Sequence, residues 1–318
     1  MSDSEKILFD AACGEGLKVA GFFNPSDASE IKGVIQICHG MSEYYTRYAP
    51  MIARFNQAGY HVCGIDMMGH GETYAANDTA NYPKGYLGPG KDAWKSTLKD
   101  IMHMHGEAVS RYGKDIKYIL YGHSMGSFVT RCIYSMPEYS CEFDGFVFAS
   151  TMGPNPAVGV AKFHAGASCV FGGEKKVNKL LTTLSFGSYL KRIPGAKTPN
   201  DWLSTDDSEV AAYRADPMLG FSFTGGGFRA LFNIIGYIQS KTAYNNLPGK
   251  PCFFVYGSED PVGSYGTGVE KVIARMKQNG TEPQSKNYGP YRHELQHESI
   301  REEYFSDLVS FADSVSRG

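Results

Sequence analysis

The first half of the chain alternates short apolar runs with longer segments of helical period, and this alternation limits the possible folds more than any other feature. Four runs are too short for helices and are bounded by Gly, His or Asp: residues 33–38, 61–66, 116–121 and 145–149. Between them, apolar residues recur three and four positions apart over 48–58, 91–112 and 125–136. Strand, helix and strand in series predict a parallel sheet with helices on both faces.

The pattern differs before and after this alternating part. Residues 6–10 and 17–22 flank Gly14-Glu15-Gly16, whose glycines permit the positive φ of a hairpin turn, so we expect an antiparallel edge pair there. Further along the chain we expect two more strands and two more helices. They are a strand at 251–256, a helix near 269–277, an extended piece at 284–287 and a final amphipathic helix over 299–315.

The stretch between residues 151 and 240 has no strong strand run and is punctuated by Gly172-Gly173, Pro194-Gly195 and Gly225-Gly226-Gly227. We therefore predict one α/β core made of residues 1–150 and 241–318. Residues 151–240 are predicted to form an inserted, mainly helical lid.

Composition narrows the class of protein. Of 318 residues 42% are hydrophobic, which is enough to build a core and excludes disorder as the main state. With 31 Lys+Arg against 33 Asp+Glu the net charge is −2, so a nucleic-acid partner is not expected. The polar start and the lack of a long apolar run predict a soluble cytoplasmic chain. The seven cysteines form no C-x-x-C pair and are expected to be reduced.

The strongest chemical signal is Gly122-His123-Ser124-Met125-Gly126, a G-x-S-x-G motif between a predicted strand and a predicted helix. In that position the motif forms a sharp turn that presents the serine oxygen at the end of the strand, and the two glycines avoid collisions in the crowded turn. We therefore predict Ser124 as a nucleophile. The amide of Met125 then lies at a helix N-terminus, where it can stabilise an oxyanion.

A serine nucleophile needs a histidine base, and the base needs a carboxylate that fixes its tautomer. Asp260 follows the predicted strand 251–256 directly, and His293 lies 33 residues further on, which is the acid-then-histidine order that this turn requires. Glu259 is the rival of Asp260. His293-Glu294-Leu295-Gln296-His297 also matches the zinc motif H-E-x-x-H, but Gly289-Pro290 just upstream favours a loop, so no metal is expected.

The second oxyanion donor is expected in the loop after the strand 33–38. His39-Gly40-Met41 follows that strand, and Gly40 lets the backbone approach a substrate closely. We assign the donor to the Met41 amide and give His39 a structural role. His123 completes the set of supporting turn and loop residues, with Gly40, Gly122 and Gly126.

Five motifs together resemble the monoacylglycerol lipase and lysophospholipase branch of the α/β-hydrolases, in the serine aminopeptidase S33 family. They are His39 to Tyr48, Asp66-Met67-Met68-Gly69-His70-Gly71, Gly122 to Ser127, Gly257 to Asp260, and His293-Glu294-Leu295. The resemblance implies an α/β-hydrolase fold with a mostly parallel eight-stranded sheet. It also implies a serine esterase that acts on lipid-like carboxylic esters through an acyl-enzyme, with no cofactor.

Aromatic residues crowd the predicted lid and are expected to form its core, to line an apolar pocket above Ser124, or both. The apolar surface of the lid could also touch a membrane or micelle. A thioesterase, an amidase or peptidase, or an acyltransferase would use the same three residues, and a non-catalytic binding scaffold is a further alternative. The oligomeric state is not predicted. The pocket candidates are Phe163, Phe171, Phe186, Phe221 and Phe223.

Overall fold

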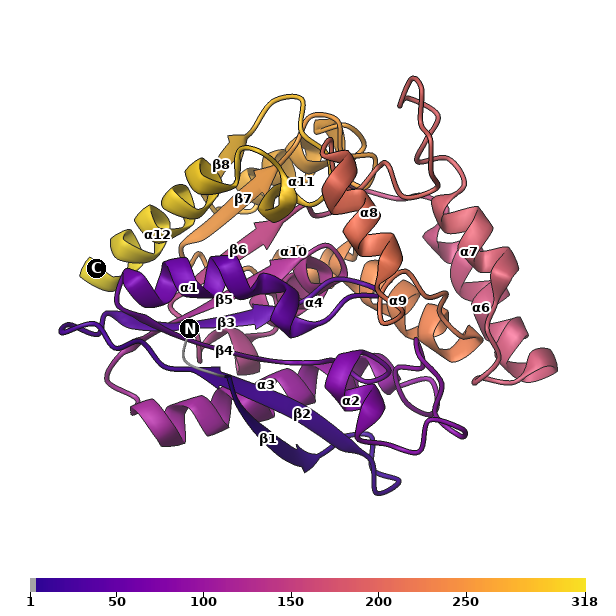
Figure 1. The fold of residues 1–318 in the computed structure, drawn as a ribbon, viewed down its shortest axis with the longest axis horizontal. Coiled ribbons are helices and arrows are strands. Elements are labelled where there is room, and N and C mark those ends of the chain that lie inside the picture. Colours follow the sequence, from indigo (N-terminus) through magenta and orange to yellow (C-terminus); the bar gives the residue numbers. More distant parts are fainter. Residues whose placement is uncertain (1–3) are drawn as a thin grey trace.

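The structure of the chain is a computed structural model that describes residues 4–318. Within these residues eight strands form one sheet in the order β1-β2-β4-β3-β5-β6-β7-β8 (Figure 1). Strand β2 runs antiparallel to both of its neighbours, whereas the six strands from β4 to β8 are parallel. The strands span Glu5–Asp10 (β1), Lys18–Asn24 (β2), Gly33–Cys38 (β3), Tyr60–Ile65 (β4), Lys117–His123 (β5), Gly145–Ala149 (β6), Cys252–Tyr256 (β7) and Gln284–Asn287 (β8). The predicted α/β fold and its antiparallel edge pair are confirmed.

Helices cover both faces of the sheet, because the central strands are apolar on both sides and must be buried twice. One face packs against α1 (Ala49–Gln57) and α12 (Arg301–Arg317). The other packs against α3 (Ala93–Tyr112), α4 (Met125–Tyr134) and α11 (Thr267–Gln278). Short elements complete the core: α2 (Gly71–Ala75), α5 (Pro137–Ser140), α10 (Lys241–Asn245) and the 3₁₀ turns Tyr45–Tyr48 and Leu295–His297.

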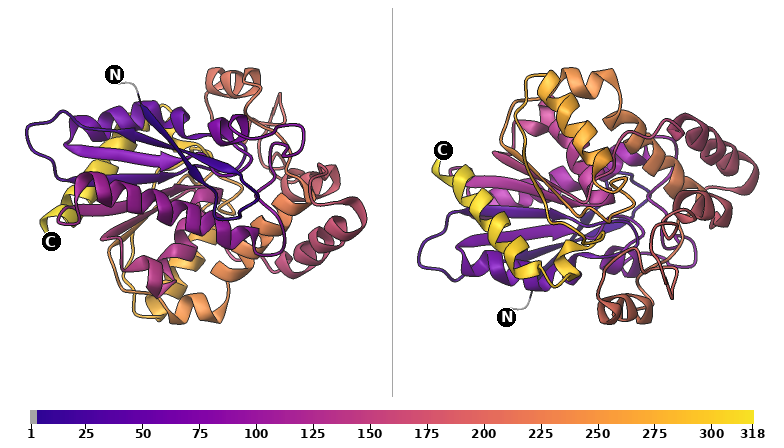
Figure 2. Two further views of the ribbon diagram at one scale, coloured as in Figure 1. Left: turned by 90° about the horizontal axis from the view of Figure 1, so that it is seen from below. Right: turned by 90° about the horizontal axis from the view of Figure 1, so that it is seen from above.

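The inserted stretch 151–240 holds four helices and projects beyond one end of the sheet (Figure 2). Helices α6 (Val158–Gly172) and α7 (Lys179–Phe186) lie outermost, and α8 (Asp207–Ala215) follows them (Figure 1). Helix α9 (Gly225–Ile238) is largely buried and packs against α4 and α3 as well as α6. The last helix of the segment thus belongs to the core by its packing, and the division into core and lid stays a prediction.

The carboxyl ends of the parallel strands β3, β5, β6 and β7 all point toward the inserted helices (Figure 1). The loops that follow these strands therefore meet at one place, which is where open α/β sheets bind their ligands. They carry Gly40, Ser124, Ser150 and Asp260. In residues 4–318, no helix has both the length and the apolar character needed to cross a membrane.

Candidate active site

Ser124 has the backbone conformation of a strained turn, with φ 51° and ψ −121° between β5 and α4. Positive φ is unfavourable for a residue with a side chain, so the surroundings must hold it. The Ser124 amide donates to the carbonyl oxygen of Ala149 at 3.0 Å. A side chain at Gly126 would collide with the carbonyl oxygens of Cys38 and His39, which explains the second glycine of the motif.

Asp260 and His293 form a buried pair, with 3.0 Å between Asp260 Oδ2 and His293 Nδ1. The other carboxylate oxygen accepts from the amide of Val262 at 2.9 Å. An ionised carboxylate only accepts, so Nδ1 carries the proton and Nε2 is left as the basic nitrogen. Ser124 and His293 line the same cavity. No hydrogen bond between their side chains is present among residues 4–318, and such bonds often tighten only when substrate is bound.

Met41 and Met125 both line the cavity. Across the described part of the chain neither amide donates to a protein acceptor, so both are free to bind an oxyanion. Two histidines hold the loop that carries Met41. His39 Nε2 accepts from the Met67 amide at 2.8 Å, and His70 Nε2 accepts from the Ser42 amide at 3.2 Å. Burial lowers the pKa of His70 to about 3, so its ring stays neutral and keeps this acceptor.

A chain of paired charges lies next to the loop that carries Gly40 and Met41, the predicted oxyanion loop. Glu43 Oε1 accepts from the Gly40 amide at 2.5 Å and from His123 Nδ1 at 3.0 Å. Glu43 Oε2 accepts from Arg47, which also makes two bonds of 2.9 and 3.0 Å to Glu294. Burial opposes ionisation of Glu43, but the hydrogen bond and charge of His123 and the charge of Arg47 hold its pKa well below the usual value.

His123 is doubly protonated in this arrangement. Its Nε2 lies 3.2 Å from the carbonyl oxygen of His293, and its Nδ1 faces the ionised Glu43. Both partners are acceptors only, so both ring nitrogens must donate. Burial opposes the charged form of His123, but the bond to Glu43 outweighs it and raises the pKa of the imidazole. Two cations and two anions are thus paired in the Glu43–Arg47–His123–Glu294 cluster.

The cavity at these groups has a volume of about 950 Å³. Its walls come from both the core loops and the inserted segment. The apolar residues of the lining include Met152, Leu181, Leu231, Phe232 and Ile235. Its polar residues include Ser42, Tyr213, Ser222 and Glu294.

The family model described as "Serine aminopeptidase, S33" (Hydrolase_4) matches residues 29–300. The chain belongs to this family. A monoacylglycerol lipase of Mycolicibacterium smegmatis is 29% identical over 72% of this chain and 70% of the relative. The phospholipase YtpA of Bacillus subtilis is 24% identical over 88% and 95%. A thermostable carboxyl esterase of Bacillus coagulans matches 99% of this chain and 100% of its own at a TM-score of 0.90 and 26% identity.

As a member of the S33 family the chain is a serine hydrolase with the α/β-hydrolase fold. Two of the phenylalanines predicted for the substrate pocket, Phe186 and Phe221, line the cavity. The other three are corrected by the structure. Phe163 and Phe171 are 74% and 90% exposed on α6, and Phe223 is fully buried in the core. Apolar residues occur on every face of α6, so the sequence could not show which face is buried.

Several site residues of this S33 protein were missed from sequence. Glu43, Arg47 and Glu294 lie inside the five motifs, but no role is predicted for them because the Arg47–Glu294 pair joins positions 247 residues apart. Trp202 was missed because the surrounding segment has no regular period. In the H-E-x-x-H stretch His293 Nδ1 pairs with Asp260 and His297 Nδ1 pairs with Glu209, and within residues 4–318 no three His, Cys, Asp or Glu side chains are grouped as metal ligands.

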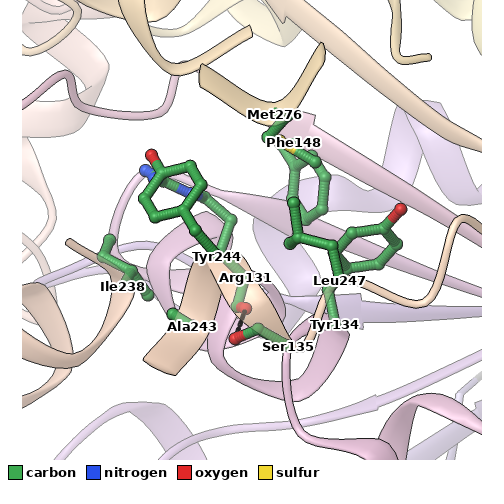
Figure 3. A pocket seen from close by; sticks show the side chains of 9 residues that line it. All are labelled: Arg131, Tyr134, Ser135, Phe148, Ile238, Ala243, Tyr244, Leu247 and Met276. Atoms are coloured by element: carbon green, nitrogen blue, oxygen red, sulfur yellow. Dashed lines mark hydrogen bonds between the residues drawn. The ribbon is translucent and has the colours of Figure 1, made fainter. Parts of the chain in front are cut away.

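A second cavity lies behind α4 and is far smaller, at about 20 Å³ (Figure 3). It has room for about one water molecule and is therefore too small for a lipid. Arg131 on its wall donates to Thr151 Oγ1 at 3.3 Å and to the Met152 carbonyl at 3.0 Å. This arginine ties the nucleophile helix to the start of the inserted segment.

Proposed function

We propose that Ser124, His293 and Asp260 form the catalytic triad of a carboxylic-ester hydrolase that acts on uncharged, monoacylglycerol-like lipids. The observation that supports it best is the arrangement at one cavity of a strained serine, a buried Asp260–His293 pair and two unpaired amides. This set supplies a nucleophile, an oriented base and oxyanion donors, which acyl transfer requires together.

In the proposed mechanism His293 Nε2 takes the proton of Ser124 while Oγ attacks the ester carbonyl carbon. The amides of Met41 and Met125 stabilise the negative charge on the carbonyl oxygen. His293 then protonates the departing alcohol and leaves an acyl-enzyme. A water molecule, deprotonated by His293, releases the fatty acid, and Asp260 stays ionised to stabilise the imidazolium.

The cavity wall favours an uncharged alcohol group. Among residues 4–318, no lysine or arginine side chain lines the cavity, so the phosphate of a lysophospholipid would lack a cationic partner. The carboxylates of Glu43 and Glu294 are paired with His123 and Arg47 and cannot bind the amine of a peptide without losing them. Glycerol hydroxyls can hydrogen-bond to the polar lining residues of the cavity without such a cost. A monoacylglycerol therefore fits better than a lysophospholipid or a peptide.

The test compares substrates that share one acyl chain. We expect the highest kcat/KM for 1-oleoylglycerol, with lower values for oleoyl lysophosphatidylcholine, oleoyl coenzyme A and an oleoyl amide. Ser124→Ala should lose turnover by several powers of ten and lose labelling by a fluorophosphonate probe, with Ser310→Ala on α12 as the unaffected control.

Substantial turnover by Ser124→Ala would refute the triad. A higher value for the lysophospholipid or the amide would refute the substrate class, and acyl transfer to added alcohols in preference to water would favour the acyltransferase.

We further propose that the outer faces of α6 and α7 touch a membrane or micelle when substrate enters. Val160 and Leu184 line the cavity and are also 62% and 66% exposed, which supports a cavity mouth between these helices. Large apolar side chains surround that place, and such patches on soluble proteins mark interaction sites. The exposed apolar residues are Val160, Phe163, Val170, Phe171, Leu180 and Leu184.

A further inference from the structure

The segment 201–205 of the insert is tied to the loop that carries His293. Arg292 donates from one guanidinium nitrogen to the carbonyl oxygens of Asp201 and Ser204 at 2.6 and 2.9 Å. The amide of Glu294 donates to the Leu203 carbonyl at 2.7 Å. The residues on both sides of His293 are therefore bonded to the residues around Trp202.

More contacts continue this connection along the two segments. Ser204 Oγ donates to the His297 carbonyl at 3.0 Å, and the amide of Thr205 donates to Glu298 at 2.8 Å. The Thr205 hydroxyl also bonds to Glu298. Because bonds of this kind run from Asp201 to Thr205, this part of the insert is a fixed wall of the site, in contrast to the exposed helices α6 and α7.

The ring of Trp202 rests against the imidazole of His293. The two ring centroids are 5.0 Å apart and the planes are inclined by 47°. Phe186 and Tyr189 pack against Trp202 at 6.0 and 5.0 Å. The ring of His123 also lies next to His293, with the ring centroids 4.9 Å apart. The imidazole thus has two aromatic ring neighbours.

We propose that Trp202 is a positioning residue for the base, which holds the ring of His293 in place and stabilises its imidazolium form during acyl transfer. The inference rests on the proposed function, because it takes His293 as the base. A tryptophan face attracts a cation more strongly than any other aromatic side chain does. Its large ring also excludes water from one side of the imidazole.

The charged groups around His293 are accounted for in this assignment. Asp260 binds Nδ1 and favours the imidazolium. The charged His123 lies next to the ring and disfavours the imidazolium, although Glu43 neutralises part of that effect. Arg292 and Glu294 flank His293 in the chain, and Glu294 is paired with Arg47. Against this background Trp202 supplies an uncharged contact that favours the protonated ring.

The first experiment does not depend on turnover. The chain has 2 tryptophans, so Trp94→Phe leaves Trp202 as the single reporter. A protonated imidazole in contact with an indole quenches its fluorescence. We expect the emission of this variant to fall as the pH is lowered from 8 to 5, and the change to vanish in Trp94→Phe/His293→Gln. Emission that does not titrate, or that titrates equally without His293, would overturn the contact.

The second experiment compares two replacements of Trp202. Trp202→Phe keeps an aromatic face, whereas Trp202→Leu keeps apolar volume without one. For Trp202→Leu we expect kcat to fall roughly 3- to 10-fold and the acidic limb of the kcat/KM profile to move to lower pH by roughly half a unit to one unit. Trp202→Phe should keep most of both properties. Trp94→Leu, the same change on α3 away from the site, should alter neither.

An unchanged kcat and pH profile in a folded Trp202→Leu protein would refute the proposal. Equal losses in Trp202→Phe and Trp202→Leu would also refute it, since they would show a need for size alone. Failure of the proposed function would be seen separately, as turnover by Ser124→Ala, while the fluorescence titration would still report on the contact of Trp202 with His293.

Discussion

At the scale of single residues, the site depends on ionisable side chains that perform no bond-making step themselves. Glu43 binds the amide of Gly40 in the oxyanion loop and the ring of His123 next to the nucleophile. It thereby fixes the loop after β3 relative to the turn that carries Ser124. Its charge is balanced inside the protein, so this positioning does not depend on solvent ions.

Glu43→Gln should therefore lower kcat roughly tenfold to hundredfold, because a small displacement of the Met41 amide weakens the oxyanion contact. The effect on KM should be smaller. Steady-state kinetics with 1-oleoylglycerol measures both, and Glu282→Gln, an exposed residue, serves as the control. A folded Glu43→Gln protein with wild-type kcat would show that the loop holds its position without this carboxylate.

Asp100 on α3 is a buried carboxyl outside the site, and its only hydrogen-bond donor within residues 4–318 is the amide of Ala12 at 2.7 Å. Burial raises the pKa of Asp100 to about 7, well above the value of roughly 3.9 expected in the unfolded chain. The folded state therefore binds the proton more tightly than the unfolded chain. The free energy of unfolding therefore falls as the pH rises from about 4 to about 7, because over this range the unfolded chain releases the proton and the folded state keeps it.

The predicted result is that the wild-type protein loses more unfolding free energy between pH 5 and pH 8 than Asp100→Asn does. The asparagine keeps an oxygen acceptor for Ala12 but cannot ionise. Only the two pH units between 5 and about 7 contribute in this window, so the difference has an upper limit of roughly 3 kcal/mol. Denaturant titrations at the two pH values measure it, and parallel losses in the two proteins would contradict the raised pKa of Asp100.

At the scale of elements, the turn between β5 and α4 works only because α4 approaches the strand β3 very closely. The carbonyl oxygens of Cys38 and His39 occupy the space that a side chain at Gly126 would need. These are backbone atoms, so they cannot rotate away. The second glycine of the motif is thus required by the packing of two elements and not by its own backbone angles.

Gly126→Ala should push α4 away from β3 and cost several kcal/mol of stability together with most of the activity. Gly106→Ala is the matched control, because Gly106 lies inside α3 with no atom near its added methyl group. That change should stabilise the protein by about 0.5–1 kcal/mol. Melting curves and ester turnover test both variants, and equal tolerance of the two would rule out the close approach.

The sequence predicted the central elements well because each signal is local. Residues 33–38 and 145–149 were expected as strands and form β3 and β6 with the same bounds. The inserted helices were less predictable, since their burial depends on distant partners. Phe163 and Phe171 have the same residue type as Phe186, yet only Phe186 reaches the cavity. In the same way, the contact of Trp202 with His293 joins positions that no local pattern connects.

At the scale of the whole molecule, the proposed membrane contact links the cavity to the exposed apolar side chains of α6 and α7, since Val160 and Leu184 line the cavity and are also exposed. The segment 201–205 is bonded to the loop that carries His293, whereas α6 and α7 present apolar side chains to solvent. Exposed lysines accompany them on the same helices and the link between them: Lys162, Lys175, Lys176 and Lys179. An apolar patch with cationic neighbours is suited to an anionic lipid surface.

The double variant Phe163→Ser/Phe171→Ser tests this arrangement, because both side chains lie outside the cavity and are highly exposed. We expect weaker binding to vesicles that contain anionic phospholipid and slower hydrolysis of 1-oleoylglycerol presented in them. Hydrolysis of a dissolved short-chain ester, p-nitrophenyl butyrate, should stay at the wild-type rate. Cosedimentation with vesicles and parallel rate measurements provide the two readouts. Unchanged vesicle binding would exclude α6 as the docking surface, and an equal loss on both substrates would indicate damage to the fold instead.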